Sequence, residues 1–191
     1  PRLSIIACLR DCRRNSASER TLLSSFFTDN THAQPSTVEV IIVDSSQESN
    51  ARDFIHESVQ SFGGIYVRDD QTHHKYSLAR ARNLGAAKAQ GEFLLFVDID
   101  LLPPADFISR IDDYLRTGRI SKAENYFSII PVFYLSDDVG SEVLSEIRSR
   151  PLTDWLNGDA ARLAASLQLV NSTLLVRKSF YTLLGGQHED F

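Results

Sequence analysis

The sequence contains no methionine and only two cysteines, Cys8 and Cys12. Two cysteines this close together provide neither a disulfide framework nor the spacing of a zinc site, so a disulfide-stabilised secreted domain is excluded and a reducing cytoplasm is favoured. Because not even an initiator methionine is present, we expect the chain to be a fragment of a longer one.

Long apolar runs and an excess of positive charge are also absent. The longest apolar runs, 93–97 and 129–135, have the length of a β-strand, well short of the roughly 20 residues that cross a bilayer. The first residues do not resemble a signal peptide, because charged residues follow the short apolar stretch at once. A net charge of -5 argues against a nucleic-acid-binding protein. We expect a cytoplasmic protein, with peripheral attachment to the cytoplasmic face of a membrane as an alternative.

What is present is an alternation of strand-like and helix-like segments. In the first half, strands are predicted at 3–9, 38–43, 65–67 and 93–97, and helices at 16–27, 50–61 and 77–90. Ser77 is a suitable N-cap for the last helix, and Gly91 a suitable C-cap. Strands separated by helices of this length indicate βαβ units, and therefore an α/β protein with a mainly parallel sheet.

The second half is less regular. Helices are predicted at 103–115, 137–148, 160–167 and 178–184, the last one ending at Gly185 and Gly186. Strands are predicted at 126–135, with an interruption near Pro131, and at 169–176. Since no repeat, low-complexity segment or linker divides the chain, we expect one domain over residues 1–191.

Charged residues follow the predicted strands at the points where they end. Open α/β sheets bind ligands beyond the carboxyl ends of their strands. The residues at those ends are Leu9 and Arg10, Asp44 and Ser45, Arg68 and Asp69, and Asp98 to Asp100. Three of the four ends carry a carboxylate, which predicts a binding site at this edge of the sheet.

The pair Asp98 and Asp100 is the sharpest local feature. Side chains two apart along a strand point the same way, so these two carboxylates repel each other unless a cation lies between them. Hard oxygen ligands of this kind suit Mg²⁺ or Mn²⁺, which also bind substrate phosphates. The alternative is a solvated loop in which Asp100 caps the next helix.

The helix predicted before this strand presents a face of small residues. Leu78, Arg82, Gly85 and Ala89 share that face. Gly85 and Ala89 allow it to lie close to the sheet, which would hold Arg82 near the strand ends. A guanidinium fixed there could bind a diphosphate or a base carbonyl, or it could form a salt bridge with Asp44 or Asp98.

The run 81–100 resembles the A-R-N-x-G-x-x-x-A-x-G-E-x-x-x-F-x-D-x-D signature of family 2 glycosyltransferases. Residues 40–45 look like the family's V-I-V-V-D-x-S strand, and residues 180–190 resemble its F-x-x-x-G-G-x-x-E-D segment. The resemblance implies the GT-A fold, a Rossmann-like three-layer sandwich. Within the family, the sequence looks closest to the branch associated with capsule and surface polysaccharide synthesis.

The resemblance also implies an activity and a set of partners. It implies transfer of a sugar, with inversion, from a nucleotide-sugar, with a UDP-sugar favoured, to a saccharide or glycolipid acceptor. Residues 1–100 would form the half that binds the nucleotide-sugar and residues 101–191 the acceptor and catalytic half. The family continues beyond its E-D motif, so acceptor-side elements are expected to be missing here.

Site residues follow from the same resemblance. Asp44 would accept a hydrogen bond from a uracil-like base, with Ser45 beside it, while Arg10, Lys75 and Arg82 would bind the nucleotide and its diphosphate. Asp98 and Ile99 would lie near the ribose, Asp98 and Asp100 would bind Mn²⁺ or Mg²⁺, and Asp190 would be the general base. The segment 7–11 departs from the family's usual P-x-Y-N, which puts the details of the base pocket in doubt.

Other interpretations of the same residues remain open. A phosphatase or nucleotidyltransferase could use Asp98 and Asp100 on a similar sheet, but Leu101 to Pro104 does not resemble the turn of the phosphatases and residues 9–17 contain no glycine. A non-catalytic scaffold domain of a larger synthase is a further alternative. His188 could add a metal ligand, although a loop histidine is more often simply exposed.

Overall fold

The computed structural model describes residues 1–10, 37–70, 76–99, 101, 103–117, 124–135, 149, 164–168 and 173–189. The helices predicted at 16–27 and 137–148 lie outside these residues. The described elements are, in chain order, β1 (Leu3–Leu9), β2 (Val38–Asp44), α2 (Ser49–Ser61), β3 (Ile65–Arg68), α3 (Leu78–Lys88), β4 (Phe93–Asp98), α4 (Phe107–Arg116), β5 (Phe127–Ile129), β6 (Val132–Leu135), β7 (Ala164–Gln168), β8 (Leu174–Arg177) and α8 (Lys178–Leu183).

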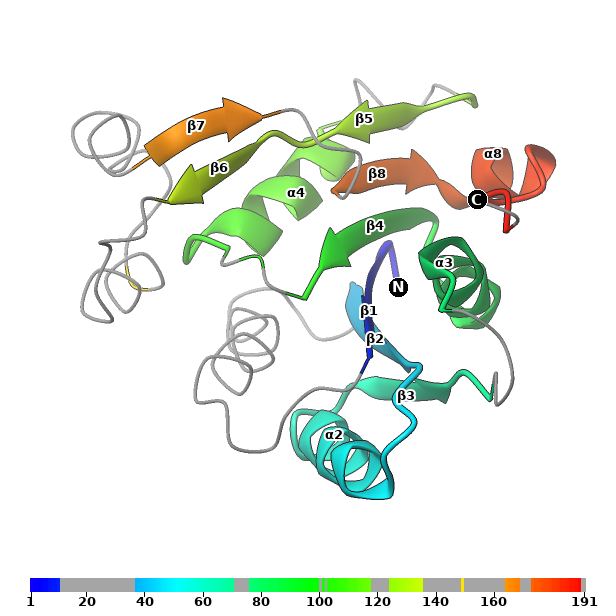
Figure 1. Ribbon diagram of the computed structural model, residues 1–191. Helices are drawn as coiled ribbons and strands as arrows, with labels where there is room; N and C mark the ends of the chain where they lie inside the picture. Colours follow the sequence, from blue (N-terminus) through cyan, green and yellow to red (C-terminus); the bar gives the residue numbers. More distant parts are fainter. Residues whose placement is uncertain are drawn as a thin grey trace.

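A six-stranded sheet with the order β3-β2-β1-β4-β8-β5 forms the centre of the molecule (Figure 1). Strands β3, β2, β1 and β4 are parallel to one another, whereas β8 runs antiparallel to both β4 and β5. The predicted α/β class and mainly parallel sheet are thus confirmed. The chain moves outward from β1 to β3 and then returns to place β4 on the other side of β1, so the strand order reverses between β1 and β4. Such a reversal opens a crevice for ligands at the carboxyl ends of the two strands.

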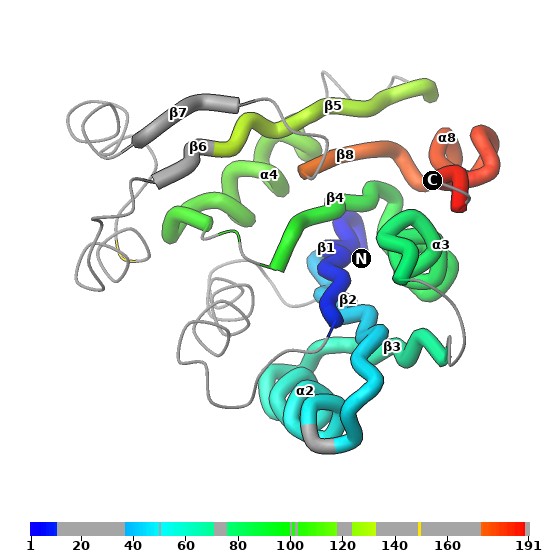
Figure 2. The backbone as a smooth tube through the Cα atoms, viewed as in Figure 1, coloured from blue at the N-terminus to red at the C-terminus, as the bar shows by residue number. Residues whose placement is uncertain are grey.

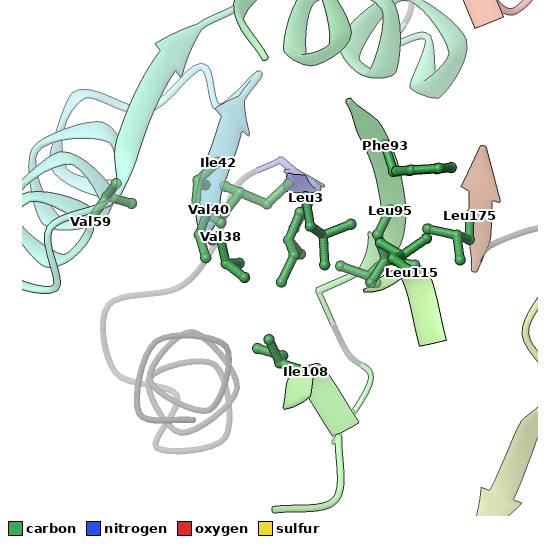
Figure 3. Packing of buried hydrophobic residues seen from close by; sticks show 14 of the residues in the cluster. Leu3, Val38, Val40, Ile42, Val59, Phe93, Leu95, Ile108, Leu115 and Leu175 are labelled. Carbon is green, nitrogen blue, oxygen red and sulfur yellow. The ribbon is translucent and has the colours of Figure 1, made fainter. Parts of the chain in front are cut away.

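Two apolar clusters cover the two faces of the sheet and make it the middle of three layers. On one face, Ile55 and Val59 of α2 and Ile108 and Leu115 of α4 pack on alternate residues of the strands (Figure 3). On the other face, α3 and α8 pack through their own buried residues, Ala81, Ala86 and Tyr181 among them. The segment after α8 comes to lie beside α3, far from it in sequence (Figure 2).

Strand β1 shows why the sheet forms where it does. All seven of its residues are buried, and its neighbours β2 and β4 are almost as apolar. A strand covered on both faces has no solvent-facing side chains, so its sequence is continuously apolar rather than alternating. The central position of β1, β2 and β4 follows from their composition.

Helix α3 begins as predicted but ends earlier. Ser77 is its N-cap, and its hydroxyl accepts a hydrogen bond from the backbone N–H of Arg80. The helix stops at Lys88 with Ala89 as C-cap, so the prediction of a helix to Gln90 with Gly91 as C-cap is wrong. Gly91 instead passes close to β1, where a Cβ atom would lie 2.7 Å from the backbone nitrogen of Ser4. Close packing, rather than helix termination, requires glycine at this position.

Two further predictions need correction in the second half. The helix predicted from Pro103 begins at Phe107, because the two prolines lie in the turn that precedes it. The helix predicted at 160–167 is wrong, since Ala164–Gln168 is strand β7. Its alanines and leucine suit a helix, but antiparallel pairing with β6 overrides that preference.

The strand predicted at 169–176 begins only at Leu174 as β8 within the described residues, with 169–172 lying outside them, and the helix predicted at 178–184 is α8. The strand predicted at 126–135 is divided near Pro131 into β5 and β6, which belong to different sheets. Gly185 and Gly186 end α8 with φ of 80° each. No helix within the described residues is long and apolar enough to cross a membrane.

Candidate active site at the carboxyl edge of the sheet

The register of the parallel strands brings the predicted site residues to one edge. Asp44 at the end of β2 pairs with Leu9 of β1 on one side and with Arg68 of β3 on the other. Asp98 at the end of β4 pairs with Cys8 of β1. The ends of four neighbouring strands therefore meet at one edge, as the sequence predicts, and the structure adds that the strand order reverses there between β1 and β4.

Asp44 is completely buried and both of its carboxylate oxygens are bonded within the protein. The backbone N–H of Ser46 donates to Oδ1 at 2.8 Å, and the hydroxyl of Tyr66 donates to Oδ2, also at 2.8 Å. The guanidinium of Arg68 lies 3.7 Å from Oδ2. Burial, followed by the bond to Asp44, raises the pKa of the Tyr66 hydroxyl, which keeps its proton and goes on donating it. Any further donor that reached Asp44 would therefore share this carboxylate with Ser46 and Tyr66.

The hydroxyl of Ser45 bonds Asp69, a strand-end carboxylate for which the sequence predicted no individual role. This hydroxyl donates to Oδ2 of Asp69 at 2.9 Å, and the Arg80 guanidinium donates to Oδ1 of Asp69 at 3.2 Å. Asp69 is buried, and its backbone N–H donates to the carbonyl of Asp44. The position of Asp69 directly after β3 is the sequence signal that could have assigned it a role in the site.

Arg82 forms the salt bridge with Asp98 that the sequence left open as one of its interpretations. Its Nη2 lies 3.2 Å from Oδ1 of Asp98, and its guanidinium carbon lies 5.8 Å from the centre of the Phe96 ring. Arg82 is only 5% exposed. A Cβ on Gly85 would lie 2.5 Å from a methyl group of Ile6, so glycine lets α3 approach the sheet and carry Arg82 to it. Asp98 remains partly exposed, and its second oxygen has no partner among the described residues.

Among the other predicted binding residues, some are described by the structure and others lie outside the described residues. Arg10 is exposed, with its guanidinium 5.8 Å from the centre of the Tyr76 ring. Ile99 packs its side chain against the core cluster under α2 and α4, so a ligand would meet its backbone rather than its side chain. Lys75, Asp100 and Asp190 lie outside the described residues.

Cys8 and Tyr76 lie near the same edge and are neutral there. Burial raises the pKa of the Cys8 thiol to about 12, and the nearby Asp98 and Asp69 carboxylates act in the same direction. Burial also raises the pKa of Tyr76 to about 12. A protonated thiol is a poor nucleophile and a poor metal ligand, so Cys8 serves packing here.

The donor chemistry at the end of β4 fits a divalent cation. Asp98 is a partly exposed carboxylate with one oxygen beyond its bond to Arg82, and hard cations prefer such ligands. Among the described residues no group of three or more metal-binding side chains occurs. The expected second ligand, Asp100, is not one of those residues.

The segment after α8 is bound to the side of α3. Its two glycines end α8 with hydrogen bonds from Gly186 N–H to Tyr181 and from Gly185 N–H to Thr182, the Schellman arrangement. The chain then meets Asn83, whose side chain bonds Gln187 and Glu189. Asn83 follows Arg82 in the signature, yet the sequence analysis gave it no role, because its partners are more than 100 residues away.

The chain is similar to one protein family and to several solved structures. The model of the family described as "Glycosyltransferase like family 2" matches residues 4–191. No curated protein sequence matches the chain significantly. Among solved structures, S. aureus TarS residues 1–349 superposes with a TM-score of 0.60 at 15% identity, covering 100% of this chain and 51% of TarS 1–349.

Two further solved structures share the fold. A TarS complex with UDP-GlcNAc has a TM-score of 0.57 at 14% identity, over 97% of this chain and 48% of that one. The mannosyltransferase PcManGT from Pyrobaculum calidifontis, in complex with GDP-Man and Mn²⁺, has a TM-score of 0.55 at 17% identity, over 100% and 48%. The chain spans about half the length of these proteins. The narrower resemblance to the capsule branch stays a prediction. With nearly all of its residues matched by the family model and with the fold of these glycosyltransferases, the chain belongs to the glycosyltransferase like family 2.

Proposed function

We propose that the chain is the nucleotide-sugar-binding and catalytic part of a metal-dependent, inverting glycosyltransferase. The observation that carries the proposal is the buried Arg82 beside Asp98 at the reversal of strand order, where open α/β sheets bind nucleotides. The donor is a nucleoside diphosphate sugar, with UDP favoured, and the acceptor is a hydroxyl of a saccharide or glycolipid.

The residues of the edge divide the work of binding between base and diphosphate. Asp44 accepts a hydrogen bond from the base, with Ser45 beside it, and Arg82 pairs with the diphosphate, with Arg10 and Lys75 contributing further positive charge. A guanidinium suits this task because its N–H groups match phosphate oxygens and it stays charged when buried. Asp98 and Asp100 would hold Mn²⁺ or Mg²⁺, and the chemistry that such an ion supplies is neutralisation of the charge on a departing diphosphate.

Asp190 takes the proton from the acceptor hydroxyl in the transfer step. The hydroxyl oxygen forms a bond to the anomeric carbon while the bond from that carbon to the diphosphate oxygen breaks. The nucleoside diphosphate leaves with the electron pair, and attack from the opposite face inverts the anomeric centre. A carboxylate within reach of the hydroxyl typically contributes about 10²–10⁴-fold to such a rate.

The ligands printed for the similar structures guide the choice of probes. TarS was crystallised with UDP-GlcNAc and PcManGT with GDP-Man and Mn²⁺. Both nucleotides are therefore included in the test. We place the protein in the cytoplasm, or at the cytoplasmic face of a membrane, on the evidence of its two isolated cysteines.

The experiment is a calorimetric titration with UDP, followed by UDP-GlcNAc and GDP-mannose, each with and without Mn²⁺. We expect micromolar binding that requires both the metal and Asp100, and that is lost in Asp100→Ala. Asp113→Ala is the matched control, because Asp113 is an exposed carboxylate on α4 whose ion-pair partner within the described residues is the nearby Arg116. A folded protein that binds neither nucleotide in any condition would overturn the proposal and favour a non-catalytic scaffold.

A further inference from the structure

The side-chain amide of Asn83 uses its whole hydrogen-bonding capacity on residues 181–189. Its Oδ1 accepts from the hydroxyl of Tyr181 at 2.6 Å and from the backbone N–H of Gln187 at 2.9 Å. Its Nδ2 donates to the carbonyl of Gln187 at 2.9 Å and to Oε1 of Glu189 at 2.8 Å. An amide has two donor hydrogens and two acceptor lone pairs, so all four positions are filled.

No other short side chain can make this set of bonds. Aspartate has the same shape but no donor, and it would bring a second carboxylate against Glu189. Serine has a single donor and reaches less far. The backbone of Gly186 also approaches so closely that a Cβ there would lie 2.5 Å from Oδ1 of Asn83. The asparagine and the glycine thus fit each other.

The held segment is fixed at both of its ends. At its start, α8 ends in the Schellman arrangement, and burial raises the pKa of Tyr181 to about 12, so that its hydroxyl remains a donor to Asn83. At its other end, the hydroxyl of Ser77 donates to the carbonyl of Glu189 at 3.3 Å. Ser77 is the N-cap of α3, so both of these contacts tie the segment to the same helix.

Consecutive residues of α3 therefore serve two sides of the proposed reaction. Arg82 reaches the end of β4 and pairs with Asp98, while Asn83 holds the chain up to Glu189. The residue that follows Glu189 is Asp190, the proposed general base. A helix that carries both contacts fixes residues 187–189 relative to the end of β4.

We propose that Asn83 is a positioning residue for the transfer step, which it serves by fixing residues 187–189, directly before the proposed base Asp190 in the sequence. This inference rests on the proposed function. Asn83 acts on the rate of transfer and leaves donor binding unchanged, because its bonds are to the protein rather than to the donor. A merely structural role would lower stability without separating kcat from KM.

The test compares Asn83→Ala with the wild-type chain in two measurements. Release of UDP from UDP-GlcNAc, with water as acceptor and Mn²⁺ present, gives kcat and KM, and calorimetry gives the Kd for UDP. We expect kcat to fall about 100-fold, as for an ångström-scale misplacement of a reacting group, with KM and Kd within about twofold. Tyr181→Phe removes one of the four bonds, and we expect about a fivefold lower kcat from it.

Gln60→Ala is the matched control, since Gln60 is an exposed amide on α2 whose side chain, in the part of the chain that the structure describes, bonds the ring of His56. It should leave kcat and KM unchanged. Amide hydrogen exchange supplies a readout that does not depend on activity. The N–H of Gln187 should exchange about tenfold faster in Asn83→Ala, while the amides of β1 keep their protection. Should Asn83→Ala fail to fold, the same exchange measurement on Tyr181→Phe replaces it.

The outcomes separate this inference from the proposed function. An unchanged kcat in a folded Asn83→Ala, or a raised Kd with normal kcat, overturns the positioning role. A wild-type chain that binds no nucleotide overturns the proposed function and the catalytic role of Asn83 with it. In that event the exchange of Gln187 still shows whether Asn83 holds the segment.

Discussion

The two ends of strand β4 carry the same arrangement of side chains for different purposes. At the start of the strand, Arg177 lies over the ring of Phe93, 4.7 Å from its centre, and pairs with Glu92 at 2.6 Å. At the other end, Arg82 lies 5.8 Å from the centre of the Phe96 ring and pairs with Asp98. Each arginine combines an ion pair with an aromatic contact, so the local energetics are alike.

The surroundings of the two pairs differ. Around Glu92 the partners are backbone groups, since Lys178 N–H donates to its carbonyl and Phe93 N–H bonds the carbonyl of Arg2. Around Asp98 the neighbouring strand ends carry further charged side chains, with Asp44 and Asp69 both buried. Several charged side chains gather at the carboxyl end, where a charged ligand could exchange partners with them, whereas the backbone bonds at the amino end stabilise the fold. The comparison predicts that mutations at the two ends separate stability from binding.

The largest effect is expected from Gly91→Ala at the amino end. The new methyl group would lie 2.5 Å from the Ser4 hydroxyl and 2.8 Å from the carbonyl carbon of Leu3, and backbone atoms cannot move aside. We expect the free energy of unfolding to fall by about 3 kcal/mol in urea denaturation. Gly63→Ala is the control, because nothing lies within 4 Å of its Cβ and only its φ of 74° opposes the change, by about 1 kcal/mol. Equal losses in the two variants would contradict the account of Gly91.

The matched arginines give the next largest effect and the sharpest contrast. Arg82→Met should weaken UDP binding by about 30-fold, since a hydrogen bond to a charged group contributes about 2 kcal/mol. Arg177→Met keeps a similar side chain over Phe93 and should leave the affinity for UDP unchanged while lowering stability. Calorimetry and urea denaturation of both variants measure the two quantities. The contrast between the ends of β4 breaks down if Arg177→Met weakens UDP binding as much as Arg82→Met.

Glu39→Ala tests the amino edge without touching an arginine. Oε1 of Glu39 accepts hydrogen bonds from the Ser4 hydroxyl and from the backbone N–H groups of Gln90 and Gly91. Removing this acceptor should lower the free energy of unfolding by about 2 kcal/mol and leave UDP binding unchanged. Glu39→Gln retains an acceptor oxygen and should lose about half as much. A weaker UDP affinity in Glu39→Ala would show that the two edges are coupled.

The smallest effect is a pH dependence at the carboxyl end. Burial raises the pKa of the Cys8 thiol to about 12, against about 8.5 in an unfolded chain. Between these values the unfolded chain has released the proton and the folded chain has kept it, so stability falls as the pH rises. The slope for this group approaches about 1.4 kcal/mol per pH unit.

Urea midpoints at pH 8, 9 and 10 in a Cys12→Ser background measure this slope. Tyr76 and Tyr181, each with a pKa raised to about 12, add to the slope only above about pH 10, where an unfolded tyrosine ionises. Cys8→Ala should therefore flatten the profile between pH 8 and 10. Parallel profiles for the two chains would mean that the Cys8 thiol ionises normally in the folded protein.

Sequence patterns were sufficient to predict the elements whose structure is decided by residues close together in the sequence. Continuous apolar runs located β1, β2 and β4, and the small residues of α3 correctly placed Arg82 against the sheet. Strand β7 was missed because its partner strand, rather than its own alanines, decides its conformation. Gly91 was misread because the close approach of Ser4 cannot be seen from residues 88–92.

In the candidate site, too, the sequence could predict the positions of residues but not the contacts between distant ones. The position of Asp44 at a strand end could be predicted, but its burial and its bond to Tyr66 depend on the pairing of β2 with β3. Asn83 lies within the recognised signature, yet its role is visible only once Gln187 and Glu189 are beside it. Roles that arise from contacts distant in sequence require the folded structure.

The contacts of Asn83 also bear on the order in which the protein folds. They join residues 104 and 106 positions apart, so the chain must close a long loop before any of them forms. Contacts of such separation generally form late, after β1, β2 and α3 have gathered into a sheet and its covering helix. During synthesis the ends of β1, β2 and β4, the proposed nucleotide-binding edge, would therefore form before residues 187–189 dock. If the proposed function holds, we expect donor binding to appear first and transfer only after residues 187–189 have docked on α3.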